Sequence, residues 1–355
     1  MDFLTRSLII NPLLIAALVS LIVTPLTIKL AWKFGLVDDP KKRKHPARLH
    51  KKITPRAGVI PIWVSLVVAS LIFLPPDRYL LGILGGATIF LILGILDDKY
   101  DLNPYLRLIG CILAAGITVF SGVKIFFITN PLGGDIIHFS QPLAIIFAII
   151  WISFLSNITN WSSGFDGQLP GIVTIAALTI ALLSFRFSAD ITQWPITILA
   201  AITAGAFLGF LPYNFFPQKI MPGYGGGTLA GFMLATLAIL STTKIGTLLV
   251  VLGIPFIDAM YSIVRRIITG HSPVWGDRGH LHHKLLDELH WSKRRTALFY
   301  WFITGILGFL ALNLRSLQKF YTIIMLIVII GSLLLWFNFF STYLNRSDQG
   351  KHSRT

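Results

Sequence analysis

The chain has 355 residues, of which 54% are hydrophobic and 13% are charged, and its mean hydropathy is +0.74. A water-soluble fold of this length has too little interior to bury so much apolar surface, so soluble classes are excluded and the bilayer must act as part of the solvent. The formal net charge of +15 does not indicate nucleic-acid binding, because the basic residues lie between apolar runs, where they would meet lipid headgroups or phosphates. The single cysteine, Cys111, lies in an apolar run, which excludes disulfides and predicts a small core hydrophobe.

Eleven apolar runs are long enough to cross a bilayer as helices. They predict an all-α integral membrane protein in which residues 1–355 form one polytopic domain. We expect the first run to remain as a span, since no small-residue cleavage site follows it. Between the fourth and fifth runs, VKIFFITNPLGGDIIHF predicts a short β-hairpin outside the cytoplasm. The predicted spans are about 8–30, 57–75, 79–96, 105–121, 142–157, 169–187, 194–212, 227–243, 245–262, 296–313 and 320–342.

The distribution of lysine and arginine predicts the orientation of these spans. With the amino terminus outside, 23 of the 30 basic residues fall in cytoplasmic connections or at the carboxyl end, and 7 fall outside. We therefore expect a multi-pass protein of the cytoplasmic (inner) membrane with a cytoplasmic carboxyl terminus. All of the unusual polar clusters then share one face, in the connections near 33–56, 97–104, 157–168, 213–226 and 263–295.

The first two clusters combine cations and carboxylates. GLVDDPKKRKHPARLHKKITPRAGV is either a positive-inside signal alone or an anion site in which Lys44, His45 and Arg56 hold a diphosphate or lipid phosphate. In the second cluster, Asp97 and Asp98 end an apolar helix, where the helix dipole and their mutual repulsion are both unfavourable. This cost favours a functional role, either holding Mg²⁺ against substrate phosphates or acting as a base.

The third and fourth clusters are rich in amides and glycines. Asn157 and Asn160 are spaced to share a helix face, and the turn that holds Asp166 follows. The amides and the carboxylate suit uracil, ribose or a metal, or the segment is only an Asn/Gly-rich turn between helices. In the fourth cluster, Gly225 and Gly226 precede a predicted helix, so their N–H groups would cradle phosphate, although a glycine run is more often a flexible link.

The fifth cluster, PFIDAMYSIVRRIITGHSPVWGDRGHLHHKLLDELHWSKRR, has the most chemistry-bearing side chains. A zinc site and a solvated loop are the alternatives to a phosphate-binding and proton-shuttling cluster. The absence of a second cysteine and the presence of an arginine favour phosphate. The residues concerned are Asp277, Arg278, His280, His282 and His283, with Asp258 in the preceding apolar helix.

In this order the clusters resemble those of the polyprenyl-phosphate N-acetylhexosamine-1-phosphate transferases (glycosyltransferase family 4). The family includes bacterial undecaprenyl-phosphate GlcNAc-1-phosphate transferases and phospho-MurNAc-pentapeptide translocase. The resemblance covers about residues 30 to 290 and is greatest to the GlcNAc-type bacterial branch. It implies ten or eleven transmembrane helices with catalytic loops on the cytoplasmic side.

The resemblance assigns roles to individual residues. Asp97 and Asp98 match the aspartate pair linked to Mg²⁺ and to activation of the lipid phosphate, and Asn160 matches an amide near the metal. Asp166 matches an aspartate assigned to uracil. The remaining matches are Asn157 in the Asn-x-x-Asn motif, Lys44, His45 and Arg56 in the basic loop, and Asp277, Arg278, His280, His282 and His283 in the Asp-Arg-x-His-x-His-His loop.

Two positions depart from the family pattern. Ser163 stands at the first aspartate of Asp-Gly-x-Asp-Gly, and Tyr224 stands where Met-Gly-Asp-x-Gly-Ser has its metal-binding aspartate. A tyrosine, with a pKa of about 10, cannot replace a carboxylate on Mg²⁺ at neutral pH. Either Asp97, Asp98 and Asn160 suffice with substrate oxygens, or the metal is held differently, or activity is lost.

The resemblance therefore predicts an enzyme that transfers N-acetylhexosamine-1-phosphate from a UDP-sugar to polyprenyl (undecaprenyl) phosphate, releases UMP and initiates cell-envelope glycan synthesis. It implies Mg²⁺, or Mn²⁺ in its place, as cofactor, and leaves a homodimer open. The alternatives are a catalytically impaired homologue that binds lipid phosphate or nucleotide sugar, and a membrane transporter. A transporter of inverted halves would show an internal repeat, and none is found in the sequence.

Overall fold

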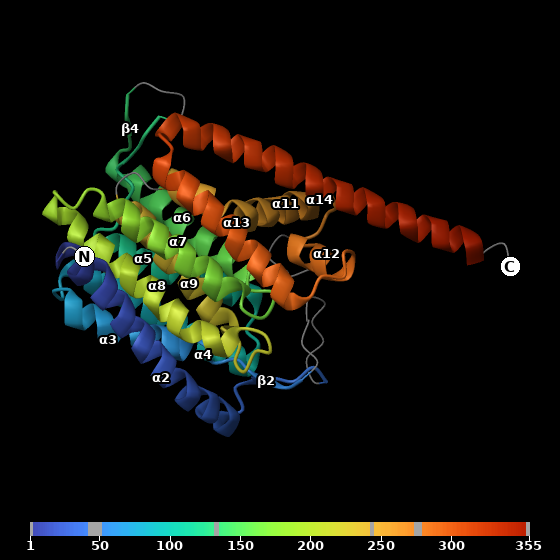
Figure 1. The fold of residues 1–355 in the computed structure, drawn as a ribbon, viewed down its shortest axis with the longest axis horizontal. Coiled ribbons are helices and arrows are strands. Elements are labelled where there is room, and N and C mark those ends of the chain that lie inside the picture. Colours follow the sequence, from blue (N-terminus) through green and yellow to red (C-terminus); the bar gives the residue numbers. More distant parts are fainter. Residues whose placement is uncertain (1–2, 42–51, 131–134, 242–244, 273–278, 353–355) are drawn as a thin grey trace.

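The protein is a bundle of long helices with two very short β-hairpins (Figure 1). A computed structural model describes residues 3–41, 52–130, 135–241, 245–272 and 279–352. The helices are α1 (Phe3–Thr5), η1 (Arg6–Ile10), α2 (Asn11–Phe34), α3 (Val59–Phe73), α4 (Arg78–Tyr100), α5 (Pro104–Phe120), α6 (Gln141–Trp161), α7 (Gln168–Phe185), η2 (Ile191–Gln193), α8 (Trp194–Asn214), α9 (Gly223–Leu240), α10 (Ile245–Val251), α11 (Gly253–Ile268), α12 (Leu281–Asp287), α13 (Lys293–Asn313) and α14 (Ser316–His352).

Each predicted apolar run forms a helix, so the all-α membrane architecture is confirmed. In the described part of the chain, eight helices are long and apolar enough to span, and the pair α10–α11, bent by 85°, makes a ninth if it is one broken span. Helices α3 and α5 are apolar but have only 15 and 17 residues. The count of eleven spans therefore stays a prediction.

Helix α9 lies at the centre of the bundle. Its most apolar window is 89% buried, whereas that of α14 is 22% buried and faces outwards. Helix α14 extends far beyond the other helices (Figure 1). The large apolar side chains exposed on the outer helices would contact lipid, because a bilayer satisfies apolar surface that water cannot.

Two antiparallel hairpins mark opposite ends of the bundle (Figure 1). Strands β3 (Phe127–Ile128) and β4 (Ile137–His138) pair as the sequence predicted, although their side of the membrane remains a prediction. Strands β1 (Val37–Asp38) and β2 (Thr54–Pro55), which were not predicted, pair at the end that carries α12. The β1–β2 hairpin places Arg56, which follows β2, against the end of α4.

Glycine contacts bring α4, α6 and α9 close together. A Cβ added to Gly94 of α4 would lie 2.6 Å from the Cα of Gly225 in α9, and one added to Gly227 would lie 2.9 Å from the Cα of Asn160 in α6. Real Cβ atoms do not approach other atoms this closely, so a larger residue would force the helices apart. These contacts bring the ends of three helices to one place.

We expect Gly94→Val to destabilise the protein, because its side chain would collide with the backbone of α9. Overpacking of this kind costs about 1–3 kcal/mol. Thermal unfolding in detergent should show a lower midpoint for Gly94→Val. Gly116→Val in α5, where an added Cβ meets nothing within 4 Å, is the matched control. Equal midpoints for the two variants would contradict the close α4–α9 packing.

Candidate active site

The carboxylates of Asp97 and Asp98 are fully buried in the last turn of α4, and two arginines neutralise them. Arg56 Nε lies 3.0 Å from Asp98 Oδ1, and its guanidinium also reaches Asp97 Oδ2 at 3.6 Å. Arg107, from the first turn of α5, contacts Asp97 and pairs with Asp101 at 2.8 Å. The mutual repulsion of the two carboxylates and their unfavourable interaction with the helix dipole suggested a functional role. The two arginines offset both costs. The buried cluster still presents both signs of charge at one end of the bundle.

Backbone hydrogen bonds fix the segment that carries Arg56. The Arg56 N–H donates to Leu36 O, the Met221 N–H donates to Pro55 O at 2.8 Å, and the Gly58 N–H donates to Met221 O at 3.1 Å. Burial by itself would lower the pKa of Arg56, but Asp98, Asp38 and Asp97 outweigh it and raise the pKa above its usual value. Arg56 is therefore a permanent cation in a fixed position.

Tyr224 fills the space beside the arginine–carboxylate cluster. Its ring lies under Arg107, with the guanidinium carbon 5.3 Å from the ring centroid, a cation–π contact. Its phenol donates to the Arg107 backbone oxygen at 3.2 Å and lies 3.3 Å from Cys111 Sγ. Tyr224 therefore supports Arg107 from one side, and its oxygen is engaged elsewhere than with the aspartates.

The two amides of the third cluster lie in the last turns of α6, on one half-buried face as predicted. The Asn157 amide donates to Ser153 O at 2.8 Å and contacts Cys111 Sγ at 3.7 Å. Asn160 packs against Gly227. Cys111 is fully buried, as expected for a core residue, and it also links α6 to Tyr224.

Gly225 and Gly226 lie inside α9, which begins at Gly223, four residues earlier than the predicted helix. Both are buried, and a Cβ on Gly225 would meet Gly94 Cα at 2.7 Å and Phe90 O at 2.8 Å. Close helix packing accounts for these two glycines without a ligand. Gly223 itself has a positive φ of 68° and lies against the Asp98 carboxylate, so the glycine that approaches the carboxylates is this one.

Asp166 is buried and already paired. Lys293, at the start of α13, donates to its Oδ1 at 2.8 Å, and the Gln218 N–H donates to its Oδ2 at 3.2 Å. The turn itself is held at Gly167, whose N–H donates to Asn214 Oδ1 and whose carbonyl accepts from Trp301 Nε1. A base that binds Asp166 would have to share or displace the Lys293 contact.

The three histidines surround the start of α12, a helix within a stretch that we predicted as a loop. His280 Nδ1 lies 2.9 Å from Asp258 Oδ2. The His280 and His282 rings are parallel with centroids 5.7 Å apart, and the His282 and His283 centroids are 4.3 Å apart. Within the described ranges, neither ring nitrogen of His282 has a hydrogen-bond partner. All three side chains are largely buried.

Short contacts join the clusters into one site. A Cβ added to Gly223 would collide with Asp98, one added to Gly227 with Asn160, and one added to Gly164 with the His282 ring, so these groups are close neighbours. The Phe165 ring also lies 5.8 Å from that of His282, between the Asp166 turn and α12. The four predicted residues that remain, Lys44, His45, Asp277 and Arg278, lie outside the described residues.

These residues, as arranged, do not fit a pre-formed magnesium site. Mg²⁺ needs an octahedral shell of oxygen ligands, and it commonly takes one or two carboxylates with substrate phosphates. Here guanidinium groups contact both aspartates, and the phenol of Tyr224 is engaged elsewhere. Across the described segments, no three His, Cys, Asp or Glu side chains are grouped to hold an ion. A metal at Asp97, Asp98 and Asn160 would have to displace or share the arginine contacts.

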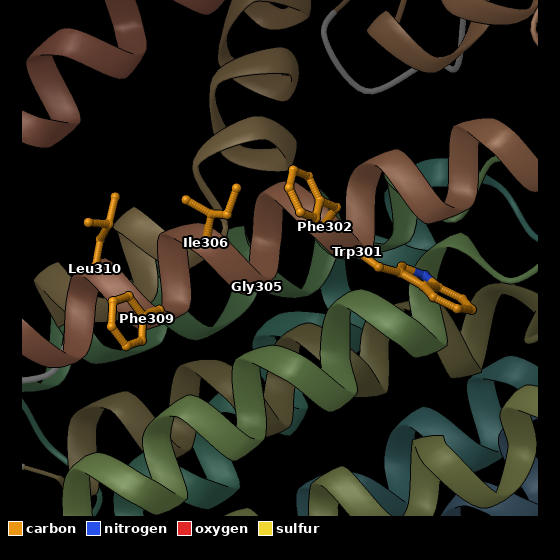
Figure 2. A pocket seen from close by; sticks show the side chains of 6 residues that line it. All are labelled: Trp301, Phe302, Gly305, Ile306, Phe309 and Leu310. Atoms are coloured by element: carbon orange, nitrogen blue, oxygen red, sulfur yellow. The ribbon is translucent and has the colours of Figure 1, made fainter.

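An apolar groove on α13 is separate from this chemistry (Figure 2). None of the predicted site residues lines it, and Phe302 and Phe309 are more than two-thirds exposed on its surface. Such a surface suits acyl chains of the bilayer. Its lining residues are Trp301, Phe302, Gly305, Ile306, Phe309 and Leu310.

Sequence reasoning missed the partners that complete the site. Arg107 was counted only for orientation, although its place one turn into the helix after Asp101 was a local signal. Lys293 gave no such signal, because its partner Asp166 lies 127 positions away. The contact of Asn214 with Gly167, which holds the Asp166 turn, likewise joins two distant positions that sequence spacing does not relate.

We expect His282 to make stability depend on pH. Burial, with repulsion from His283 and His280, holds its pKa well below the usual 6.5, so the ring is neutral near pH 7. The unfolded chain binds this proton near pH 6.5, so stability should fall as pH drops below that, by up to about 1.4 kcal/mol per pH unit. The unfolding midpoint should fall less between pH 7 and pH 5 in His282→Phe than in the wild type. His138→Gln on exposed β4 is the control, and a wild-type slope in His282→Phe would contradict the assignment.

Comparison with known proteins identifies the family. Residues 80–242, from α4 to the end of α9, match the model of glycosyl transferase family 4. A probable undecaprenyl-phosphate N-acetylglucosaminyl 1-phosphate transferase of Bacillus subtilis is 30% identical, covering 91% of this chain and 89% of the relative. A decaprenyl-phosphate N-acetylglucosaminephosphotransferase of Mycolicibacterium smegmatis is 30% identical, covering 83% of this chain and 79% of the relative. A phospho-N-acetylmuramoyl-pentapeptide-transferase of Mycobacterium bovis is 28% identical, covering 82% of this chain and 92% of the relative. The chain belongs to glycosyl transferase family 4, as its motifs predicted.

Proposed function

We propose that the protein transfers N-acetylglucosamine-1-phosphate from UDP-N-acetylglucosamine to a polyprenyl phosphate of the undecaprenyl type. An oxygen of the lipid phosphate attacks the β-phosphorus of the donor, the bond from that phosphorus to the bridging oxygen breaks, and UMP leaves. The observation that carries the proposal is the buried Asp97–Asp98 pair with its two arginines, joined to the histidine cluster in a chain of this family.

The residues present suit a reaction between two anions. Arg56 and Arg107 are cations fixed at the helix ends, and they would neutralise the diphosphate and the attacking lipid phosphate. Asp97 and Asp98 would hold these arginines in place and accept a proton from a lipid phosphate that arrives protonated. His280, His282 and His283 would bind the phosphate of the leaving UMP. Asp166 and Lys293 would meet the nucleotide.

Magnesium stays a prediction from the family pattern. A divalent ion would supply further charge neutralisation to the diphosphate when bound. Tyr224 stands in place of one carboxylate that the family pattern assigns to the metal. The two that remain, Asp97 and Asp98, form ion pairs with the arginines. The proposed roles above therefore rest on the chain's own side chains.

The decisive experiment supplies purified protein with UDP-GlcNAc, undecaprenyl phosphate and Mg²⁺. UMP release should be accompanied by a polyprenyl-diphospho-sugar detected by mass spectrometry. Asp98→Asn should lower turnover roughly 100-fold or more. It should also lower the unfolding midpoint, because Arg56 loses its buried partner. Rates are therefore compared per folded protein.

Asp77→Asn is the matched control, since Asp77 caps the other end of the same helix, where asparagine caps equally well. Wild-type turnover in Asp98→Asn would remove the aspartate pair from the mechanism. No UMP from folded wild type with several UDP-sugars would favour the catalytically impaired homologue that Tyr224 suggests.

Tyr224→Asp should lower the Mg²⁺ concentration needed for the half-maximal rate, because it adds a third carboxylate beside Asp97 and Asp98. Tyr224→Asn is the matched control: it leaves the same space but adds no charge. Both variants lose the ring under Arg107 and should unfold at a lower temperature than the wild type. Identical Mg²⁺ titrations for the two variants would show that position 224 does not reach the metal.

We also propose that the site faces the cytoplasm, with the amino terminus outside. In a variant whose Cys111 is replaced by serine, Lys99→Cys and His271→Cys should react with an impermeant thiol reagent only after the cells are opened. Both positions are exposed, as is Ala189→Cys, which should react in intact cells. Labelling of either site-face cysteine in intact cells would reverse the orientation.

A further inference from the structure

The buried aspartate of α11 is not used in the reaction proposed above. Asp258 lies in the helix that follows the 85° bend of α10–α11, and it is 4% exposed. A carboxylate buried in an apolar helix is costly unless hydrogen bonds compensate it. The hydrogen-bond partners of its two carboxylate oxygens therefore indicate its role.

Both oxygens of Asp258 are directed to the start of α12. Oδ1 accepts the Leu281 backbone N–H at 2.8 Å, and Oδ2 lies 2.9 Å from His280 Nδ1. Ser262, one turn further along α11, is a weaker second neighbour of the same nitrogen at 3.4 Å. One carboxylate thus fixes the backbone and the ring of the first histidine in the cluster.

This contact determines which nitrogen of His280 carries a proton. An ionised carboxylate only accepts hydrogen bonds, so the neutral ring must be protonated at Nδ1. Nε2 is then the nitrogen with the lone pair, on the side of the ring away from Asp258. Parallel stacking on His282, with ring planes 4° apart, restrains rotation of the ring.

We propose that Asp258 is a positioning residue that holds the Nδ1–H of His280, so that Nε2 can take up a proton from solvent and donate it in a hydrogen bond to the phosphate of the nucleotide sugar. The inference rests on the proposed transferase function. Asp258 itself does not touch substrate; it acts on the reaction through the His280 ring, while its other oxygen holds the Leu281 backbone. The bent span is thereby coupled to the histidine cluster through one carboxylate.

The test compares Asp258→Asn, His280→Gln and the double variant in UMP release. Asparagine keeps the size of the side chain and one acceptor oxygen, but its amide can offer Nδ1 a donor and favour the other tautomer. We expect kcat to fall about 10- to 100-fold in Asp258→Asn with KM nearly unchanged. The double variant should be no slower than His280→Gln alone, because Asp258 acts through that ring.

Ser262→Ala is the matched control, since it removes only the longer contact to the same nitrogen, and its kcat should stay within about twofold of the wild type. Asp258→Glu keeps the charge and should recover part of the rate lost in Asp258→Asn. Two results would indicate a structural role and overturn the proposal. One is a double variant whose loss of kcat equals the product of the two single losses, and the other is an unfolding midpoint that falls in proportion to kcat.

A readout without turnover separates this proposal from the reaction itself. In protein labelled with ¹⁵N-histidine, the wild type should give one Nδ1–H resonance that is missing from His280→Gln and that changes to the Nε2–H pattern in Asp258→Asn. This result would stand even if no UDP-sugar releases UMP. The same Nε2–H pattern in the wild type would overturn the tautomer assignment.

Discussion

The structure depends on the burial of two adjacent carboxylates at the end of an apolar helix. Removing charge from water is tolerable only when each charge is paired and hydrogen-bonded, so Asp97 and Asp98 require cations nearby. Arg56 and Arg107 come from different segments, one after the β1–β2 hairpin and the other from the start of α5. Their pairing ties both segments to α4. In the proposed reaction, these two fixed cations would neutralise the phosphates.

Small residues make this arrangement geometrically feasible. Helices α4, α6 and α9 meet at Gly94, Gly225 and Gly227, whose lack of side chains lets the backbones approach. Helix packing of this kind is common in membranes, where apolar surface alone does not draw helices together. The glycine run that looked like a phosphate loop is therefore largely a packing surface. Only Gly223, with its positive φ beside Asp98, stands at the polar end.

The sequence predicted the elements better than their partners. Apolar length was sufficient to find every long helix, because the bilayer imposes it locally. The β3–β4 pair was predicted from a different signal, the segment VKIFFITNPLGGDIIHF. The predicted orientation puts the five polar clusters on the cytoplasmic side, and contacts of Asp98, Asn160 and His282 join these clusters. The β1–β2 pair, the short helix α12 and the early start of α9 were missed. So were the pairs Asp166–Lys293 and Asp97–Arg107, since tertiary packing decides which charges meet. Only the short spacing between Asp101 and Arg107 gave a local signal.

Tyr224 is best understood through the charge balance of the site. Relative to the family pattern the chain lacks two carboxylates, at Ser163 and Tyr224, whereas Arg56 and Arg107 supply two cations beside Asp97 and Asp98. A site with fewer negative groups attracts the phosphates of its substrates more and a metal cation less. The Tyr224 ring contributes to this shift, because it occupies the space beside Asp97 and supports the Arg107 guanidinium with its face. In the proposed reaction, Tyr224 would thus leave more of the charge neutralisation to the protein and less to a bound ion, and its phenol would not need to ligate anything.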